Sequence, residues 1–216
     1  MVKRFEIITE ADARILDVGA TVELAKGGHV TPLAQDTLAA RRVTVVPMGS
    51  SDASLPPDLA PASDIRRVTI GSDHTGLTLK RALLEHLRGR GVAVTDVGTG
   101  TTDPVDYPDI AGAVARSVAR GEADAGIAID GAGIGSAIAA NKVRGVRAAM
   151  CLNETTARYS REHNGANVIT LGSTLIEGTA AAIRIVDVWL GTPMREARYI
   201  RRLLKIRRLE DGFDRA

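Results

Sequence analysis

The sequence predicts an α/β protein whose main domain is a parallel β-sheet covered by helices on both faces. Short apolar runs alternate with helical stretches from residue 68 to near the end of the chain. Continuous apolar strands that alternate with helices are typical of parallel crossover units with a sheet buried on both sides. The chain is 44% hydrophobic but only 3% aromatic, so Val, Ile, Leu and Ala must build its core.

Five strands and six helices are expected in this main domain. The strands are predicted at residues 68–73, 92–98, 125–130, 146–151 and 167–172. The helices are predicted at residues 77–90, 108–121, 136–142, 154–164, 179–191 and 193–211. In the first of these helices, leucines at 79, 83, 84 and 87 share one face, as an amphipathic helix requires.

A smaller unit precedes the main domain. Residues 48–65 are rich in Ser, Pro and Asp, which indicates a linker between an N-terminal extension, residues 1–47, and the main domain, residues 66–216. The extension reads as a small α+β unit, with a helix start near Thr9 and a second at Thr31-Pro32. Because about 47 residues bury little apolar surface alone, we expect this unit to dock on something.

Composition excludes several classes of protein. No apolar run approaches the ~18 residues of a membrane span, and the first residues do not resemble a secretory signal. A single cysteine, Cys151, excludes an internal disulfide and a multi-cysteine metal site, and favours a reducing, cytoplasmic setting. We expect Cys151 to have a packing role.

Positive charge is concentrated near the C-terminus. Seven basic residues and one acid give +6 over residues 195–208, so the rest of the chain, whose total is +2, carries −4. Such a helix could be simply solvated or could bind nucleic acid. Because leucines and isoleucine at 203, 204, 206 and 209 interleave with the arginines, one face must pack, and we expect no nucleic-acid partner.

Polar residues that follow the predicted strands, together with those that end the helix predicted at residues 154–164, are expected to meet at one edge of the sheet. They are Asp73, His74, Tyr107, Asp130, His163 and Asn164. Each has a structural alternative: Asp73 and Asp130 could cap helices, and His163 could end one.

A glycine-rich turn, DGAGIG at residues 130–135, follows the third predicted strand. It differs from the dinucleotide fingerprint G-x-G-x-x-G in its spacing and in its place after the third strand rather than the first. Its backbone amides at a helix start nevertheless suit an anion or a developing negative charge.

These motifs together resemble one family. GSDHTGLTLK, DYPD, DGAGIGSAIAANK, SREHN and the C-terminal arginine helix occur in the order and spacing of the type B ribose-5-phosphate isomerases, which include the galactose-6-phosphate isomerase subunits. The resemblance covers residues 66–210 and implies a Rossmann-like α/β/α sandwich with a five-stranded parallel sheet. It also implies aldose–ketose isomerisation of a sugar phosphate through an enediolate, no metal or organic cofactor, and a homodimer or homotetramer with active sites between subunits.

The resemblance assigns roles to single residues. Asp73 and His163 would serve ring opening, and Asn164 would bind a hydroxyl. His74 would lie near the phosphate and Tyr107 would line the sugar pocket. The amides of Gly131, Gly133 and Gly135 would stabilise the enediolate. Arg198 and Arg202, one helical turn apart, would reach the phosphate from a neighbouring subunit.

Three positions depart from the family pattern. Many members have a cysteine base where this chain has Asp130, and others use a glutamate where it has Ser136. Asp130 is therefore the expected base. Many members also have a phosphate-binding arginine where this chain has Thr174. The alternative is a homologue that binds a sugar phosphate without turnover, or with an altered reaction.

The N-terminal extension resembles a leading segment of some bacterial microcompartment proteins, such as the ethanolamine-utilisation cobalamin adenosyltransferase. The shared pattern runs from ITEADAR through VELAKGGHVTPLAQDTLAARRVTV. It implies an enzyme housed in or tethered to a shell. The other interpretation is that the extension braces a dimer.

Overall fold

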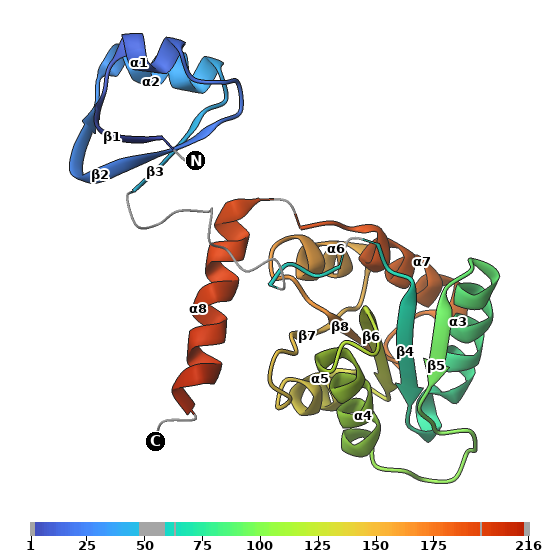
Figure 1. Cartoon of the computed structure of the whole chain (residues 1–216). Coiled ribbons are helices and arrows are strands. Elements are labelled where there is room, and N and C mark those ends of the chain that lie inside the picture. Colours follow the sequence, from blue (N-terminus) through green and yellow to red (C-terminus); the bar gives the residue numbers. More distant parts are fainter. Residues whose placement is uncertain (1–2, 48–58, 63, 195, 214–216) are drawn as a thin grey trace. The chain divides into compact units, whose positions relative to one another are not determined.

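The computed structural model of the chain describes residues 3–47, 59–62, 64–194 and 196–213. Backbone contacts divide the chain into two units, residues 1–56 and 57–216 (Figure 1). Each unit has its own sheet and its own apolar core. Most of the predicted linker, residues 48–58 and 63, lies outside the described residues.

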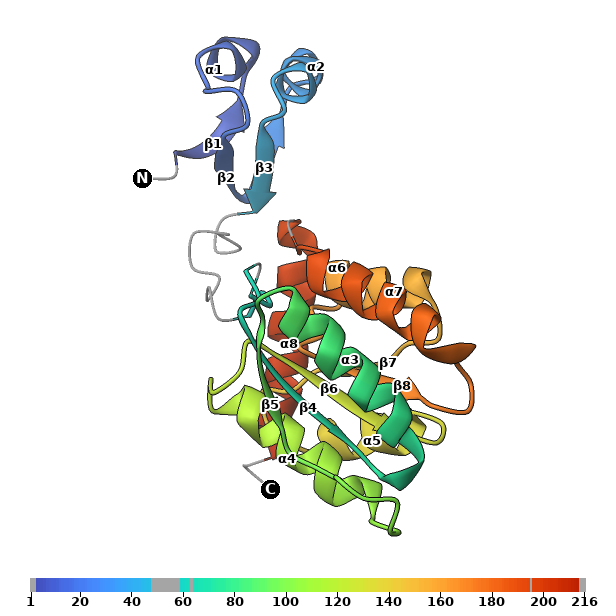
Figure 2. The ribbon, with the colours of Figure 1, turned by 90° about the vertical axis from the view of Figure 1, so that its right-hand side faces the viewer.

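The first unit is a three-stranded parallel sheet in the order β1-β2-β3, with both of its helices on one face (Figure 2). Its elements are β1 (Arg4–Ile8), α1 (Glu10–Arg14), β2 (Thr21–Val30), α2 (Pro32–Ala40) and β3 (Thr44–Pro47). Helix α1 begins as expected, because Thr9 and Asp12 form a capping box. Strand β1 is an addition to the expected elements, since charged residues interrupt its apolar pattern.

The second unit contains a five-stranded parallel sheet in the order β5-β4-β6-β8-β7. Its strands are β4 (Arg67–Ser72), β5 (Ala93–Asp96), β6 (Ala125–Asp130), β7 (Ala148–Met150) and β8 (Val168–Gly172). Every residue of β6 and β8 is buried, which explains why both read as continuous apolar runs. The predicted third strand matches β6 residue for residue.

Helices cover both faces of this sheet and make three layers, as the sequence predicts (Figure 1). One core lies between the strands and α3, α6 and α7; a second lies between the strands and α4 and α5. The helical elements are η2 (His74–Gly76), α3 (Leu77–Gly89), α4 (Tyr107–Ala119), α5 (Ile134–Ala140), α6 (Glu154–Glu162), α7 (Gly178–Gly191) and α8 (Ala197–Phe213). Among the described residues, no helix is long and apolar enough to span a membrane.

The strand order reverses direction between β4 and β6. The chain first crosses from β4 to β5 on one side and then returns to β6 on the other. In such sheets ligands bind outside the carboxyl ends of the strands at this switch point. Asp73 follows β4 and Asp130 ends β6, so the two carboxylates flank the switch point, and Asp73 N donates to Ile129 O at 3.0 Å.

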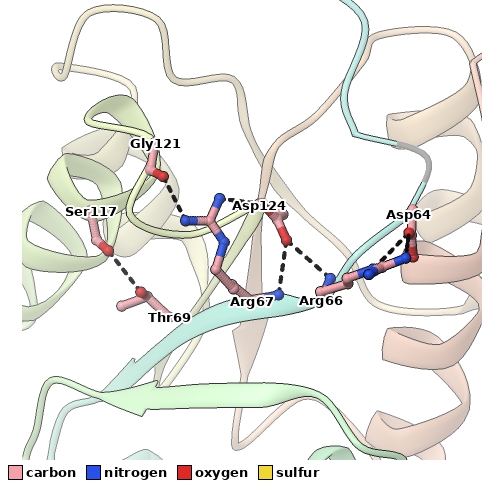
Figure 3. Close-up of polar contacts among 7 residues, drawn as sticks. All are labelled: Asp64, Arg66, Arg67, Thr69, Ser117, Gly121 and Asp124. Carbon is pink, nitrogen blue, oxygen red and sulfur yellow. Dashed lines mark hydrogen bonds and ion pairs between the residues drawn. The ribbon is translucent and has the colours of Figure 1, made fainter.

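Polar contacts join the strands at the opposite, amino edge (Figure 3). The Asp124 carboxylate accepts hydrogen bonds from the backbone N–H groups of Arg66 and Arg67, at 3.0 and 2.8 Å, and from the Arg67 guanidinium at 2.7 Å. Asp124 precedes β6 and Arg67 begins β4, so this carboxylate ties the starts of the two central strands together.

Helix α8 lies along the amino edge. It shares an apolar cluster with Leu59 and Met194 through Tyr199 and Leu203. Farther along, Asp211 pairs with Arg144 just ahead of β7. A cavity of about 380 Å³ between α8 and the sheet is lined by residues that precede strands, namely Gly121, Gly145 and Asn167, and by α8 itself.

Candidate active site

The glycine turn after β6 is pressed against the end of β8. Gly133 has a φ of +77°, and a Cβ on it would come within 2.9 Å of Gly172 N. A Cβ on Gly172 would in turn come within 2.5 Å of Ala132 O. Both positions therefore require glycine, and their contact fixes the turn that begins α5.

The Asp130 carboxylate is held inside this turn. It is 4% exposed, and Oδ1 accepts hydrogen bonds from the backbone N–H groups of Ala132, at 2.8 Å, and Gly133. Oδ2 accepts from Ser136 N at 2.8 Å. Asp130 thus binds the glycine turn and the first turn of α5, although the N-cap of α5 is Gly133 rather than Asp130. The Gly133 N–H group, expected to stabilise an enediolate, donates to Asp130 Oδ1 instead.

Asp73 is bonded through one of its two carboxylate oxygens. Its Oδ1 accepts from Thr75 N at 2.9 Å, Thr75 Oγ1 at 2.6 Å and Gly76 N at 3.2 Å, which caps η2. Within the described part of the chain, no hydrogen bond reaches its Oδ2. Asp73 is 7% exposed, so it is a nearly buried carboxylate with one oxygen open to a ligand.

His74 and Tyr107 are brought to the same edge by the loop between β5 and α4. Val105 N donates to His74 Nδ1 at 3.4 Å. The Tyr107 ring lies against Gly135, because a Cβ there would come within 2.5 Å of Tyr107 Cζ. Tyr107 is 41% exposed, so its ring forms one wall beside the glycine turn.

Thr75, Ser173 and Thr174 also belong to this edge, although Thr75 and Ser173 were not among the expected site residues. Ser173 Oγ lies 3.4 Å from Thr75 Oγ1. Thr174 stands where many family members have arginine, and it donates to Gly131 O through both N, at 3.0 Å, and Oγ1, at 2.6 Å. Thr75 lies two residues after Asp73, and Ser173 and Thr174 directly follow β8; these positions at strand ends are the signal that could have identified them.

The expectation that His163 and Asn164 meet these residues within one chain is wrong. Helix α6 starts at the carboxyl edge after β7 and runs back, so it ends at the amino edge, where the chain enters β8. There the His163 ring lies between Tyr159 and Tyr199, with ring centroids 4.7 and 4.6 Å apart. Asn164 is exposed, and its Nδ2 donates to Tyr159 O at 3.2 Å.

The predicted phosphate ligands share this amino edge through α8. Arg202 is exposed, and its guanidinium lies 5.5 Å from the centre of the Tyr199 ring. Arg198 is the second residue of the same helix. The chain therefore carries two separate groups: Asp73, His74, Tyr107 and Asp130 at the carboxyl edge, and His163, Asn164 and the arginine helix at the amino edge.

Cys151 is a packing residue, as expected. It is fully buried after β7, and its Sγ lies 3.6 Å from Ser160 Oγ. Burial raises the pKa of the Cys151 thiol, so little of the nucleophilic thiolate forms.

The match to known proteins decides the family. The family model described as Ribose/Galactose Isomerase matches residues 68–206. The chain belongs to the ribose/galactose isomerase family. It is 42% identical over 146 residues to ribose-5-phosphate isomerase B of Escherichia coli, an alignment that covers 68% of this chain and 97% of that protein. Membership in the family places the chain among the aldose–ketose isomerases.

Solved structures of the family confirm the fold of the main domain. The structure of Clostridium thermocellum ribose-5-phosphate isomerase B matches at 46% identity with a TM-score of 0.67, covering 68% of this chain and 99% of that one. The structure of ribose-5-phosphate isomerase B from Mycoplasma genitalium, with bound ribulose 5-phosphate, matches at 42% identity with a TM-score of 0.64. The match covers 67% of this chain and 96% of that one. The first unit precedes the region that the family model matches.

Proposed function

We propose that this member of the ribose/galactose isomerase family interconverts an aldose phosphate and a ketose phosphate, either ribose 5-phosphate and ribulose 5-phosphate or a closely related pair. The observation that carries the proposal is the grouping of Asp73, His74, Tyr107 and the glycine turn at the switch point of the sheet. In the reaction a proton leaves C2 of the open-chain aldose and another is delivered to C1. The aldehyde oxygen becomes a hydroxyl, and the C2 hydroxyl becomes the ketone.

Two carboxylates compete for the role of base. The place of Asp130 in the family pattern favours it, and its Oδ2, with a single donor, keeps one lone pair. The hydrogen bonding favours Asp73, because all three of its donors bind Oδ1 and leave Oδ2 open, whereas both carboxylate oxygens of Asp130 accept hydrogen bonds. A general base contributes about 10²–10⁴-fold to the rate, so substitution separates the two.

A second copy of the chain would complete the site. One chain has its two groups at opposite edges, so a sugar phosphate held by Asp73 and His74 needs His163 and the arginines of another copy. Exposed isoleucines on α5 beside the glycine turn, Ile134 at 53% and Ile138 at 59%, support burial of that surface in a homodimer or homotetramer.

The test is to measure ketose formation from ribose 5-phosphate and from related aldose phosphates by the full chain. We then compare three substitutions, Asp130→Asn, Asp130→Cys and Asp73→Asn. If Asp130 is the base, Asp130→Asn lowers kcat by about 10²–10⁴-fold and Asp130→Cys, which supplies the thiol of many relatives, recovers part of it. If Asp73 is the base, the loss falls on Asp73→Asn. Wild-type protein that forms no ketose from any of these substrates contradicts the proposal.

One observation favours a competing function, a homologue that binds a sugar phosphate without turnover or with an altered reaction. The Asp130 carboxylate uses amides that a developing enediolate would need. Calorimetric titration with ribose 5-phosphate distinguishes the two functions: tight binding with no ketose formed favours the non-catalytic homologue.

The first unit supports an additional, separate proposal, that it attaches the enzyme to a bacterial microcompartment shell or cargo protein, or else braces the oligomer. Its own apolar core, built around Ile8, Leu16 and Leu38, indicates a folded module rather than a tail. Removal of the extension should abolish co-purification with shells if it is a tether, and should weaken the oligomer if it is a brace.

A further inference from the structure

Two arginines fasten residues 59–62 to the main domain. Arg147 Nη2 donates to Leu59 O at 3.0 Å, and Arg161 Nη2 donates to Ala62 O at 2.7 Å. Residues 59–62 precede the region that the family model matches, which begins at residue 68. The segment is therefore an addition to the shared fold that the main domain binds closely.

The same arginines hold the loop that follows His163. Arg147 Nε donates to Gly165 O at 2.8 Å, and Arg161 Nη1 donates to Ala166 O at 2.7 Å. Each guanidinium therefore bridges residues 59–62 to the two residues that lead into β8. Movement of the segment would disturb this loop.

Arg161 depends on these backbone acceptors. Its side chain is fully buried, and its guanidinium lies 4.8 Å from the centre of the Trp189 ring. Burial, with a smaller effect of the nearby positive charge of Arg147, lowers the pKa of Arg161 to about 10. Its hydrogen bonds within the described residues go to the backbone carbonyls of Ala62 and Ala166. Ala62 O is therefore one of the few groups that compensate for burial of the Arg161 charge.

The side chain of Leu59 reaches the amino-edge group itself. Leu59 is 3% exposed and belongs to the apolar cluster of Tyr199 and Leu203 at the start of α8. The Tyr199 ring is tilted by 33° against the His163 ring, whose other face stacks on Tyr159 at 17°. A cluster that fixes Tyr199 also fixes one face of the His163 ring.

We propose that residues 59–62 are a positioning segment for the amino-edge half of the active site, which hold Tyr199 and thereby the His163 ring and the start of the arginine helix. The proposal rests on the proposed function for the roles of His163 and α8 in catalysis. The placement of the His163 ring can be measured without any enzymatic activity, so the positioning proposal and the proposed function can fail independently.

The first test is proton NMR of the full chain, which has four histidines, with His163 assigned through His163→Gln. Ring currents from Tyr159 and Tyr199 should displace its imidazole resonances. Leu59→Ala should move them toward the position of an unstacked histidine, and Tyr199→Leu should do the same. Leu59→Met, which conserves volume, and Leu33→Ala, at an exposed leucine of the first unit, should leave them in place.

The second test is kinetic. Leu59→Ala should lower kcat/KM for the aldose phosphate about tenfold, because it misplaces His163, which is proposed to act on the substrate. Leu59→Met should keep kcat/KM close to that of the wild type. The double variant Leu59→Ala/Tyr199→Leu should lose no more than Tyr199→Leu alone, since the two act through one ring. Urea unfolding followed by fluorescence of the single Trp189 verifies that each variant is folded.

His163 resonances that stay in place in a folded Leu59→Ala protein, while Tyr199→Leu moves them, would overturn the proposal. Additive losses in the double variant would also overturn it. If the wild-type protein forms no ketose, the proposed function fails, and the NMR comparison alone decides whether the segment positions His163.

Discussion

The ring of Tyr107 occupies the space that a side chain at Gly135 would need, since a Cβ there would come within 2.5 Å of Tyr107 Cζ. The contact joins the start of α4, which follows β5, to the first turn of α5, which follows β6. It thereby places the Tyr107 ring beside the glycine turn that follows Asp130.

Gly135→Ala should displace the Tyr107 ring and lower kcat/KM by about 100-fold, because a shift of roughly 1 Å in a site wall has that effect. Assays of ketose formation check this. Gly89→Ala is the matched control, since a Cβ at Gly89 meets nothing within 4 Å. An active Gly135→Ala enzyme would show that Tyr107 does not line the substrate pocket.

Thr174→Val should destabilise the protein by about 1 kcal/mol, because it removes the Oγ1 hydrogen bond to Gly131 O and keeps the size of the side chain. Thr174→Ser, which retains the hydroxyl, should be close to wild type. The free energy of unfolding in urea measures both. Equal stability of the two variants would mean that this bond does not secure the glycine turn.

Lys80 is 1% exposed, and its Nζ donates to Asp96 Oδ1 at 2.7 Å and to Thr99 O at 2.6 Å. Lys80→Met should lower the free energy of unfolding by about 2 kcal/mol, less than for a fully buried pair because Asp96 is one-third exposed. Arg81→Met, at the exposed next position, should change it by no more than about 0.5 kcal/mol. A loss as small as that of the control would contradict the role of Lys80 in holding the β5–α4 loop.

The hydrogen bonds at the amino edge predict a dependence of stability on pH. Burial pushes the pKa of Asp124 upward, but the hydrogen bonds from the Arg67 guanidinium and from the amides of Arg66 and Arg67 outweigh it and lower the pKa (Figure 3). A carboxylate whose pKa is lower in the folded state stabilises the protein above its unfolded pKa of about 4, and this contribution is lost as pH falls through the folded value.

Asp124→Asn should therefore be less stable than wild type by about 1 kcal/mol at pH 7, and the difference should shrink below pH 4. Urea unfolding from pH 7 to pH 3 measures it. A difference that stays constant over this range would mean that ionisation of Asp124 does not contribute.

Mixing two inactive variants tests whether active sites lie between copies. Asp73→Asn keeps a complete amino edge, and His163→Gln keeps a complete carboxyl edge. In a randomly mixed symmetric dimer, half of the molecules are hybrids with one intact site each, so activity should recover to roughly a quarter of wild type. Unchanged inactivity after subunit exchange would place the complete site within one chain.

The elements of the main domain could be predicted because local pattern and burial agree. The continuous apolar run of β6 and the leucine face of α3 each lie where the sequence places them. The predicted strand at residues 92–98 is longer than the observed β5 (Ala93–Asp96), although Val97 and Gly98 still form backbone hydrogen bonds with β4. Strand β1, with its charged residues, has no such local signal.

The site could be predicted only in part. The carboxyl ends of β4 and β6 follow from the alternation of strands and helices, and so does the placement of Asp73 and Asp130. The edge on which His163 lies depends on the direction of α6. This helix runs from the carboxyl end of β7 back toward the start of β8, so a residue at its end lies at the amino edge. Whether Asp130 faces a substrate or its own turn depends on three amides that the spacing of glycines does not reveal.

The most direct measurement is exchange at the sugar itself. The full chain is incubated with ribose 5-phosphate in deuterated water, and the products are followed by NMR. Isomerisation through an enediolate predicts that ribulose 5-phosphate forms with solvent deuterium at C1 and that recovered ribose 5-phosphate carries deuterium at C2. Binding of ribose 5-phosphate with neither ketose nor deuterium exchange would contradict the account.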